Sequence, residues 1–420
     1  MIEAGADEIP EDIMLEAIMA GHREIQKITE FIKGIVAEIG KPKFTYESFD
    51  VAPELYDAIA EFAKDKMYDA VQAVDKEDRD AKLEVLQAEI EEYLKEKYGE
   101  AYEEIAPKVG DAVYKLEKKT VRHMILEEHK RVDGRALDEI RPLSAEVDVL
   151  PRVHGSALFS RGQTQVMSIV TLGTIGDEQE LDGLDEETSK RYIHHYNFPP
   201  YSVGEARPSR GPGRREIGHG ALAERALAPV IPSQDEFPYT IRVVSEILSS
   251  NGSTSQGSIC GSTMALMAAG VPIKEPVAGI STGLVTDDTD RSRYIMLTDI
   301  QGLEDFFGDM DFKVAGTKNG ITAIQVDIKI DGLTRDIIKE AFERTRVARM
   351  YILNEVMLKA IPEPRKELSK YAPKIISMKI DVDKIKDVIG SGGKTINKII
   401  ADTGVKIDIE EDGSVFIAGT

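Results

Sequence analysis

Residues 240–269 read TIRVVSEILSSNGSTSQGSICGSTMALMAA and join a strand pattern to a helix pattern through a polar turn. The run 240–247 is rich in β-branched residues, as strands are. The turn 251–255 then presents hydroxyl groups and backbone N–H groups at a helix start, where an anion binds favourably. Ser and Thr at this place are equally typical of a plain helix N-cap. The following helix carries three small residues four positions apart, which allow close packing: Gly257, Gly261 and Ala265.

Other short segments around this unit are rich in β-branched and aromatic residues and are bounded by Gly, Pro, Asn or Asp, which predicts further strands. These strands span residues 147–150, 156–159, 165–172, 192–198, 280–285, 294–299 and 321–330. Helical patterns interrupt them at residues 220–229, 255–269 and 335–360. Strands mixed with helices in this way indicate an α/β or α+β domain of roughly two hundred residues.

The first 130 residues read as helix. An apolar face recurs at three- and four-residue steps, and Asp12 after Pro10 is a helix start signal. The face consists of Ile25, Ile28, Ile32, Ile35 and Ile39. Further helices are predicted near residues 53–73, 80–98 and 110–130. Because no chemically reactive groups converge here, this part is interpreted as a small helical bundle.

A third unit follows a linker that begins at Pro362 and Pro364. Its predicted order is strand, helix, glycine loop, helix and two strands, at residues 378–382, 382–388, 390–393, 395–403, 405–409 and 415–418. The loop Gly390-Ser391-Gly392-Gly393 allows close approach to a sugar-phosphate chain, and Lys394 opens the next helix at its anion-friendly end. A three-stranded sheet of this kind normally has another covering helix, so the unit is expected to be incomplete.

The composition is that of an ordinary globular chain of 420 residues, 42% hydrophobic and 30% charged. The sequence contains no uninterrupted apolar span long enough to cross a membrane and no secretory leader. This predicts a cytoplasmic protein without membrane association. The single cysteine, Cys260, excludes an internal disulfide and a cysteine-rich zinc site, and is expected to be a small core residue. The net charge of -22 disfavours a polyanionic partner. Basic residues nevertheless concentrate in segments 207–215 and 366–398, so nucleic-acid binding has to be judged locally.

A pair of arginines is the second candidate for phosphate binding. Arg214 and Arg215 stand directly before a helical pattern and after a run rich in Gly and Pro. Two adjacent guanidinium groups can fork onto successive phosphates or onto two faces of one phosphate. A surface arginine pair that is salt-bridged to carboxylates has the same pattern.

A carboxylate cluster is the third candidate. Asp311 and Lys313 are two residues apart, hence on one face of an extended segment, and a lysine beside a carboxylate keeps it ionised. Three more aspartates crowd the same segment: Asp299, Asp305 and Asp309. Hard oxygen ligands in this number suit Mg²⁺ or Mn²⁺, although acidic turns are also typical of solvated loops.

Several motifs stand in the order found in the second ribonuclease-PH-like core of the polynucleotide phosphorylase family, which this chain resembles over essentially its whole length. They are RVDGR at 131–135, IRP at 140–142, FSRGQTQ at 159–165, RREIGHG at 214–220, SNGSTS at 250–255 and GDMDFK at 308–313. The resemblance implies an α+β multidomain chain with an all-α linker bundle, a ribonuclease-PH-like α/β core and a truncated KH domain. The implied divisions are the end of a first core at 1–39, the helical linker domain at 40–128, the second core at 129–362, a linker at 363–375 and an incomplete KH domain at 376–420.

The resemblance also implies a reaction. In the family, inorganic phosphate attacks the last phosphodiester of single-stranded RNA and releases a nucleoside diphosphate, a reversible 3′-to-5′ phosphorolysis used in mRNA degradation. Phosphate would be held by Ser253, Thr254 and Ser255, and phosphate or RNA by Arg214 and Arg215. Mg²⁺ or Mn²⁺ would be held by Asp305, Asp311 and Lys313, with Asp311 also transferring a proton. RNA contacts are implied for His219, Arg161, Gly390, Ser391, Gly392, Gly393 and Lys394.

Rival functions follow from the same resemblance. The family assembles as a homotrimeric ring that uses both cores, so a chain without the first core and the last RNA-binding module could be inactive. A hydrolytic or non-catalytic RNA-binding relative is a second rival, against which the retained arginines, hydroxyls and carboxylates argue. A metal-dependent phosphatase is a third, and the sequence lacks the histidine-containing ligand set for paired metals.

Overall fold

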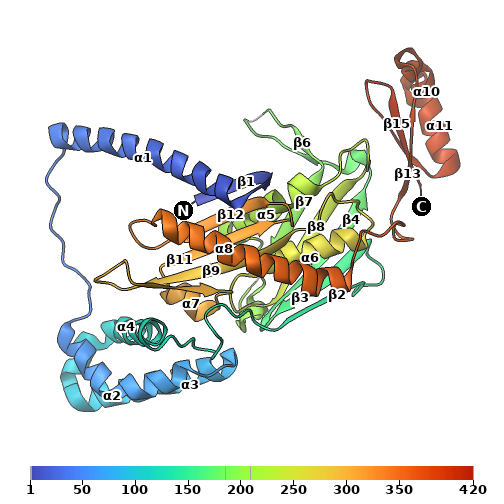
Figure 1. The fold of residues 1–420 in the computed structure, drawn as a ribbon. Coiled ribbons are helices and arrows are strands. Elements are labelled where there is room, and N and C mark those ends of the chain that lie inside the picture. Colours follow the sequence, from blue (N-terminus) through green and yellow to red (C-terminus); the bar gives the residue numbers. More distant parts are fainter. Residues whose placement is uncertain (1, 185, 209, 420) are drawn as a thin grey trace.

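The computed structural model describes residues 2–184, 186–208 and 210–419. A body built on two five-stranded sheets carries a helical bundle at one end and a small α/β unit at the other, as Figure 1 shows. A long helix near the amino terminus projects from the body on the bundle side. The mixed α+β architecture predicted from the sequence is therefore confirmed.

The first sheet of the body has the order β2-β3-β4-β8-β7. Its strands are β2 (Leu143–Val147), β3 (Gly155–Arg161), β4 (Thr164–Gly173), β7 (Tyr192–Asn197) and β8 (Thr240–Ser249). Neighbouring strands are antiparallel except β7 and β8, which are parallel. Two short strands, β5 (Gln179–Glu180) and β6 (Ser189–Lys190), form a separate hairpin beyond β4.

The second sheet has the order β1-β12-β11-β9-β10, and all of its pairs are antiparallel. Its strands are β1 (Ile2–Ile9), β9 (Ala278–Thr286), β10 (Tyr294–Thr298), β11 (Met310–Gly316) and β12 (Ile321–Ile328). Every residue of β9 and β11 is buried, so these two strands form the centre of the body. Helices flank the sheets at α5 (Arg214–Leu227), α7 (Gly302–Phe307), α8 (Arg335–Tyr351), a π-helical turn (Ile352–Met357) and α9 (Leu358–Ala360).

Helix α6 (Thr254–Ala268) is buried along its whole length and packs on β3, β4 and β9. The small residues predicted to allow this packing do so. A Cβ atom added to Gly257 would come 3.0 Å from Val166, and one added to Gly261 would come 2.8 Å from the Ser168 hydroxyl. Cys260, on the same helix, contacts the backbone of Gly279 in β9 and is fully buried, which confirms that it is a core residue.

The bundle consists of α2 (Pro53–Val71), α3 (Lys76–Tyr98) and α4 (Tyr102–Glu128), as the sequence predicted for this stretch. Its apolar core continues into the body without a break, through residues of β9, β10 and α7. Arg122 of α4 also forms a buried ion pair with Asp309, with Nη1 2.8 Å from Oδ1. The bundle and the second sheet are therefore firmly joined.

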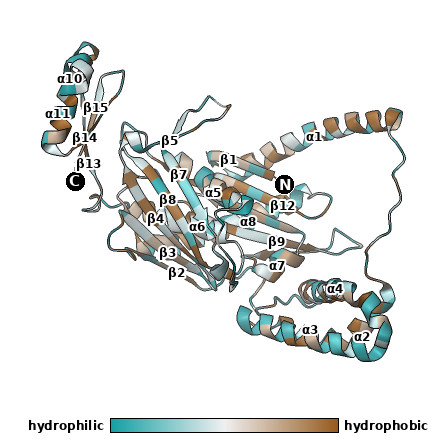
Figure 2. Cartoon of the chain, turned by 180° about the vertical axis from the view of Figure 1, so that it is seen from behind, coloured by the Kyte–Doolittle hydropathy of each residue, from teal (hydrophilic) through white to brown (hydrophobic). Residues whose placement is uncertain are grey.

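The prediction that the chain begins as helix is wrong for residues 2–9. This segment is β1, which pairs with β12 at the edge of the second sheet. Helix α1 (Glu11–Ile39) follows, as the start signal at Asp12 predicted, but it lies outside the bundle. Its isoleucine face is exposed, and Figure 2 shows hydrophobic residues along the projecting end.

The carboxy-terminal unit has the predicted element order. It contains β13 (Lys374–Lys379), α10 (Ile385–Ile389), α11 (Lys394–Thr403), β14 (Lys406–Ile409) and β15 (Ser414–Gly419), with sheet order β13-β15-β14. Ile376 and Met378 of β13 are exposed. Across the part of the chain that is described, no helix is both long and apolar enough to cross a membrane.

Candidate phosphate and metal pocket

A cavity of about 510 Å³ lies where the turn before α6 meets α5, α7, β11 and the first turn of α3. The sequence clusters at Arg215, Ser253–Ser255 and Asp305–Lys313, which are far apart along the chain, meet in its walls. The lining residues are Lys76, Asp80, Phe198, Val203, Glu205, Arg207, Arg215, His219, Ser250–Ser255, Gly302, Asp305, Phe306, Asp311 and Lys313.

The floor of the cavity is the start of α6. Its N-cap residue, Ser253, has a left-handed backbone (φ 52°) and makes no capping hydrogen bond through its side chain to any described residue. The Oγ atoms of Ser253 and Ser255 are buried and unpartnered within the described chain. Thr254 differs, because its hydroxyl is hydrogen-bonded to the Tyr196 hydroxyl at 2.5 Å. The N-cap alternative thus fails for Ser253, and two hydroxyls and a helix start face the cavity, as anion binding requires.

The turn that leads into this floor depends on a glycine. Gly252 has φ 94°, a conformation that L side chains rarely adopt. A Cβ atom there would also lie 3.0 Å from the backbone of Ile300 and Gln301. The turn therefore packs directly on the segment that connects β10 to α7, and α7 carries Asp305.

The acidic wall combines Asp311 of β11 with Asp305 of α7. Lys313 Nζ lies 2.8 Å from Asp311 Oδ2, which confirms the shared strand face. The other oxygen, Asp311 Oδ1, is buried and has no hydrogen-bond donor among the described residues. Burial raises the pKa of Asp311 above its ordinary value, although Lys313 opposes this shift. Asp305 is half-buried, with Lys329 Nζ 3.6 Å from Oδ1.

These oxygens fit a hard divalent ion of the Mg²⁺ type. Mg²⁺ is commonly held by one or two carboxylates together with water and substrate phosphates. Asp305 and the unpaired Oδ1 of Asp311 supply such a pair, while no group of three His, Cys, Asp or Glu that could hold a metal occurs in the described residues. Lys313 is expected to orient Asp311 instead of binding the ion, because an ammonium group has no lone pair.

The basic side of the cavity differs from the sequence prediction in one respect. Arg215 lines the cavity with Arg207, whereas Arg214, one position earlier on α5 and exposed like Arg215, is not among the lining residues. Successive helical residues diverge in direction, so only one of two adjacent arginines reaches the wall. His219, one turn further on, is in the wall, and burial lowers its pKa to about 3. The ring is therefore neutral, and its Nδ1 is unpaired among the described groups.

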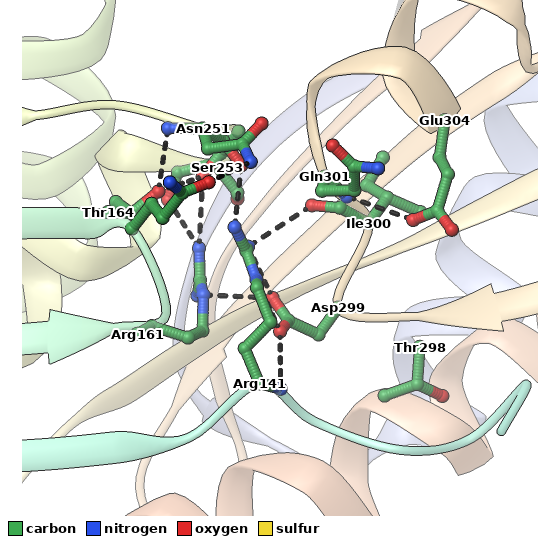
Figure 3. Close-up of polar contacts among 12 residues, drawn as sticks. Arg141, Arg161, Thr164, Asn251, Ser253, Thr298, Asp299, Ile300, Gln301 and Glu304 are labelled. Atoms are coloured by element: carbon green, nitrogen blue, oxygen red, sulfur yellow. Dashed lines mark hydrogen bonds and ion pairs between the residues drawn. The ribbon is translucent and has the colours of Figure 1, made fainter. Parts of the chain in front are cut away.

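Behind the turn, three arginines surround one aspartate, as Figure 3 shows for two of them. Asp299 Oδ1 lies 2.8 Å from Arg141 Nη2 and 2.8 Å from Arg161 Nε, and Oδ2 lies 3.2 Å from Arg135 Nη1. Burial opposes the ionisation of Asp299, but Arg141 and Arg161 outweigh it and hold the pKa of this carboxyl well below its ordinary value. The cluster is thus charged inside the body.

The same arginines hold the turn itself. Arg161 Nη2 donates to the Ser253 carbonyl at 2.9 Å, and Arg141 Nη1 donates to the Asn251 carbonyl at 2.5 Å. The Thr164 hydroxyl donates to the Gly252 carbonyl at 3.0 Å. The expected RNA contact of Arg161 is wrong, because its side chain is fully buried and directed at backbone carbonyls. Its contribution is to the shape of the turn.

The remaining predicted residues lie outside the cavity. Asp309 is committed to Arg122 and accepts from the backbone N–H and the hydroxyl of Thr286, so it is a structural residue. The loop Gly390–Gly393 and Lys394 lie in the carboxy-terminal unit, at the opposite end of the body from the bundle (Figure 1). Sequence reasoning missed several further wall residues, among them Lys76, Arg207, Phe198 and Phe306. Arg207 lay within a segment recognised as basic, but no local signal singled out the others.

Three protein-family models match the chain, one each in the body, the helical bundle and the carboxy-terminal unit. The model of the 3′ exoribonuclease family, domain 1, matches residues 139–272, that of the polyribonucleotide nucleotidyltransferase RNA binding domain matches residues 54–136, and that of the KH domain matches residues 375–420.

Curated relatives match nearly the whole chain. A polyribonucleotide nucleotidyltransferase of Ruminiclostridium cellulolyticum is 66% identical over 99% of this chain, and one of Caldicellulosiruptor saccharolyticus is 65% identical over 100% of it. The chain covers 59% of each of these two relatives. Among solved structures, rice Rrp46 is similar with a TM-score of 0.43 and 21% identity, covering 53% of this chain and 96% of its own.

Proposed function

The chain belongs to the polyribonucleotide nucleotidyltransferase family and spans 59% of the length of curated members, and we propose that it carries a phosphorolytic 3′-to-5′ exoribonuclease site. One observation supports this most directly. Unpartnered hydroxyls of Ser253 and Ser255 share a single cavity with the Asp311–Lys313 pair and Arg215. The hydroxyls and Arg215 suit binding of the attacking phosphate. The Asp311–Lys313 pair suits stabilisation of the charge that develops on the leaving O3′.

The proposed reaction uses inorganic phosphate as the second substrate. Ser253, Ser255 and the first N–H groups of α6 bind it, and Arg215 and Arg207 neutralise its charge and that of the RNA end. A phosphate oxygen attacks the phosphorus of the last phosphodiester, so that a new P–O bond forms and the bond to O3′ of the preceding nucleotide breaks. The electron pair stays on that O3′, and the terminal nucleotide leaves as a nucleoside diphosphate.

In this proposal Asp311 has two parts and Asp305 has one. A proton shared between Lys313 Nζ and Asp311 Oδ2, 2.8 Å apart, is transferred to the leaving O3′. Asp305 and Asp311 Oδ1 would hold Mg²⁺ or Mn²⁺, which when bound supplies positive charge next to the phosphates. His219, neutral and unpaired at Nδ1, is assigned a hydrogen bond to RNA or phosphate.

The partners of the whole protein are proposed from the same membership. Single-stranded RNA would contact the Gly390–Gly393 loop, where Gly390 has φ 71° and Gly393 φ 78°, conformations that favour glycine. Lys394 begins α11 beside this loop. Assembly as a homotrimer and a cytoplasmic location stay predictions.

Deleting residues 376–420 should weaken RNA affinity more than turnover, as filter binding and single-turnover rates would show.

The decisive test is phosphate dependence. The purified chain is incubated with oligoadenylate and Mg²⁺, with and without inorganic phosphate, and the products are separated by chromatography. Nucleoside diphosphates should form only when phosphate is present. Nucleoside monophosphates formed without phosphate would instead show a hydrolase, and RNA binding without either product would favour the non-catalytic alternative.

A further inference from the structure

We infer that the helical bundle contributes an RNA-binding residue to this pocket: Lys76 binds an RNA backbone phosphate. Gln163 positions the start of the bundle helix α3 against the turn before α6. The inference deepens the proposed function and rests on it. It concerns Lys76 of α3, which carried no recognisable local signal for the site, and Gln163 of the β3–β4 turn, which lies within the FSRGQTQ motif but was given no role there.

The first observation is the position of Lys76. It is the first residue of α3, is half-buried and lines the cavity together with Asp80. A cation at a helix start is disfavoured by the helix dipole, so helix stability gives no reason for a lysine there. Its closest carboxylate among the described residues is Asp80, with Nζ 4.0 Å from Oδ2, at the limit of an ion pair. The ammonium is therefore available to an anion in the cavity.

The second observation is the amide of Gln163, which joins α3 to the turn. Its Nε2 donates to Asp75 Oδ2 at 2.9 Å, and its Oε1 accepts from Lys76 N at 3.3 Å and from Asn251 Nδ2 at 3.1 Å. Asp75 is the N-cap of α3, where Oδ1 accepts from Glu77 N and Asp78 N. One side chain thus connects the start of the bundle helix to the first residue of the phosphate-binding turn.

The third observation is that the bundle cannot easily move away. Arg122 Nη1 donates to the Phe307 carbonyl at 2.9 Å as well as to Asp309, and Tyr114 of α4 meets Phe307 edge to face, with ring centroids 5.3 Å apart. Phe307 is the last residue of α7, the helix that carries Asp305. Bundle, metal wall and turn are therefore one connected unit around the cavity.

The ligand of Lys76 follows from the arrangement of charge. The attacking phosphate is assigned to Ser253 and Ser255, and the metal wall is formed by Asp305 and Asp311. Lys76 extends from a different element, and a compact ammonium with three donors suits a single phosphodiester oxygen. The backbone phosphates of the bound RNA are the remaining anions in this reaction, and Lys76 reaches them from the bundle side of the cavity, whereas Arg215 and Arg207 line it from other elements.

The test compares two lysines of the same helix. Lys82 of α3 does not line the cavity and is exposed in a pair with Asp78, so Lys82→Ala is a matched control for Lys76→Ala. The probe is fluorescein-labelled oligoadenylate, and binding is measured by anisotropy over a range of KCl concentrations. Lys76→Ala should weaken binding about tenfold and lower the salt slope by about 0.7, the value for one contact to a single strand. Lys76→Arg should restore most of the binding.

Gln163 is tested as a positioning residue. Gln163→Leu should raise the KM for RNA several-fold with a smaller change in kcat. Asp75→Asn keeps the helix cap but turns an amide NH2 toward Gln163 Nε2, so it should raise the same KM by a smaller factor. Equal binding by the Lys76→Ala and Lys82→Ala chains would overturn the inference alone. A wild-type chain that neither binds the probe nor forms nucleoside diphosphates would overturn the proposed function first, so the two failures are distinguishable.

Discussion

The two sides of the turn from Asn251 to Ser255 are opposites in how their polar groups are used. Behind it, the carbonyls of Asn251, Gly252 and Ser253 all accept hydrogen bonds from buried side chains. In front, the hydroxyls of Ser253 and Ser255 have no partner in the described chain, and neither has Asp311 Oδ1 across the cavity. The rear is complete without a ligand, whereas the front is not.

This difference separates stability from binding. A buried polar group without a partner costs folding free energy, about 1–3 kcal/mol each, so a front of this kind persists only where a rear of strong contacts fixes it. The left-handed conformation of Ser253 is fixed in this way by Arg161. Changes at the front should therefore reduce function and spare the fold, and changes at the rear should do the reverse.

The largest expected effect is at the front. Asp311→Asn should lower the rate of phosphorolysis by about 10³-fold, because it removes the proton donor and one charge from the metal wall. The unfolding midpoint in urea should stay close to that of the wild type. A chain that keeps full activity with this change would refute the assignment of Asp311.

The next effect is at the rear. Asp299→Asn should lower the free energy of unfolding by about 3–5 kcal/mol, because buried guanidinium groups lose their counter-charge. Urea denaturation followed by circular dichroism measures this. If the variant were as stable as the wild type but inactive, the rear would belong to the reaction and the comparison would fail.

A matched pair of serines on α6 sharpens the comparison. Ser255→Ala removes an unpartnered hydroxyl, so the KM for phosphate should rise about tenfold while stability is unchanged or higher. Ser258, almost one turn later, donates to Ser245 Oγ at 2.7 Å, so Ser258→Ala should lower stability by about 1 kcal/mol without changing that KM. Equal effects of the two changes on phosphate KM would contradict the assignment of Ser255.

The smallest effect concerns two histidines whose pKa values are both lowered by burial but whose surroundings differ. Burial lowers the pKa of His194 and of His219 to about 3. Both are neutral when folded, and the unfolded chain takes up protons below an ordinary pKa of about 6.5, so stability should fall as the pH drops below that value. Each should cost about 1 kcal/mol by pH 5.5.

Phosphate should distinguish these histidines. His194 lies within a hydroxyl network with Ser245 and Tyr192, whereas His219 lines the cavity. A bound anion should raise the pKa of His219 alone. The ring-proton shifts of both histidines, followed by NMR over a pH series with and without phosphate, measure this; parallel shifts would place phosphate elsewhere.

How far the sequence could predict this site depended on the range of the contacts. Ser253, Ser255 and the Asp311–Lys313 pair were predicted because a strand-to-helix turn and a two-residue spacing are local patterns. Lys76 and the role of Gln163 could not be, because Gln163 bonds to Asn251 of the turn across 88 residues of the chain and to Lys76 across 87. Arg161 was misassigned for the same reason, since an arginine in a motif does not reveal whether it faces a ligand or a carbonyl.

The fold errors have local causes. In β1 the residues Ile2, Ala4 and Ala6 alternate with more polar neighbours and are less exposed than them, a strand pattern that the helical signals after Pro10 obscured. Strand β11 does alternate, with Met310, Phe312 and Val314 apolar and Asp311 and Lys313 polar, but it was interpreted as part of an acidic, turn-rich segment because of its charged residues.

The buried thiol on α6 allows opening of the body to be followed by its rate of chemical modification. Cys260 is fully buried between the sheets, and burial raises its pKa to about 11, so a thiol reagent can reach it only when the body opens. The helix that carries Cys260 also forms the floor of the cavity. The modification rate of this sulfur therefore reports how often this part of the body opens. Slower labelling in the presence of phosphate would then measure site occupancy without any turnover.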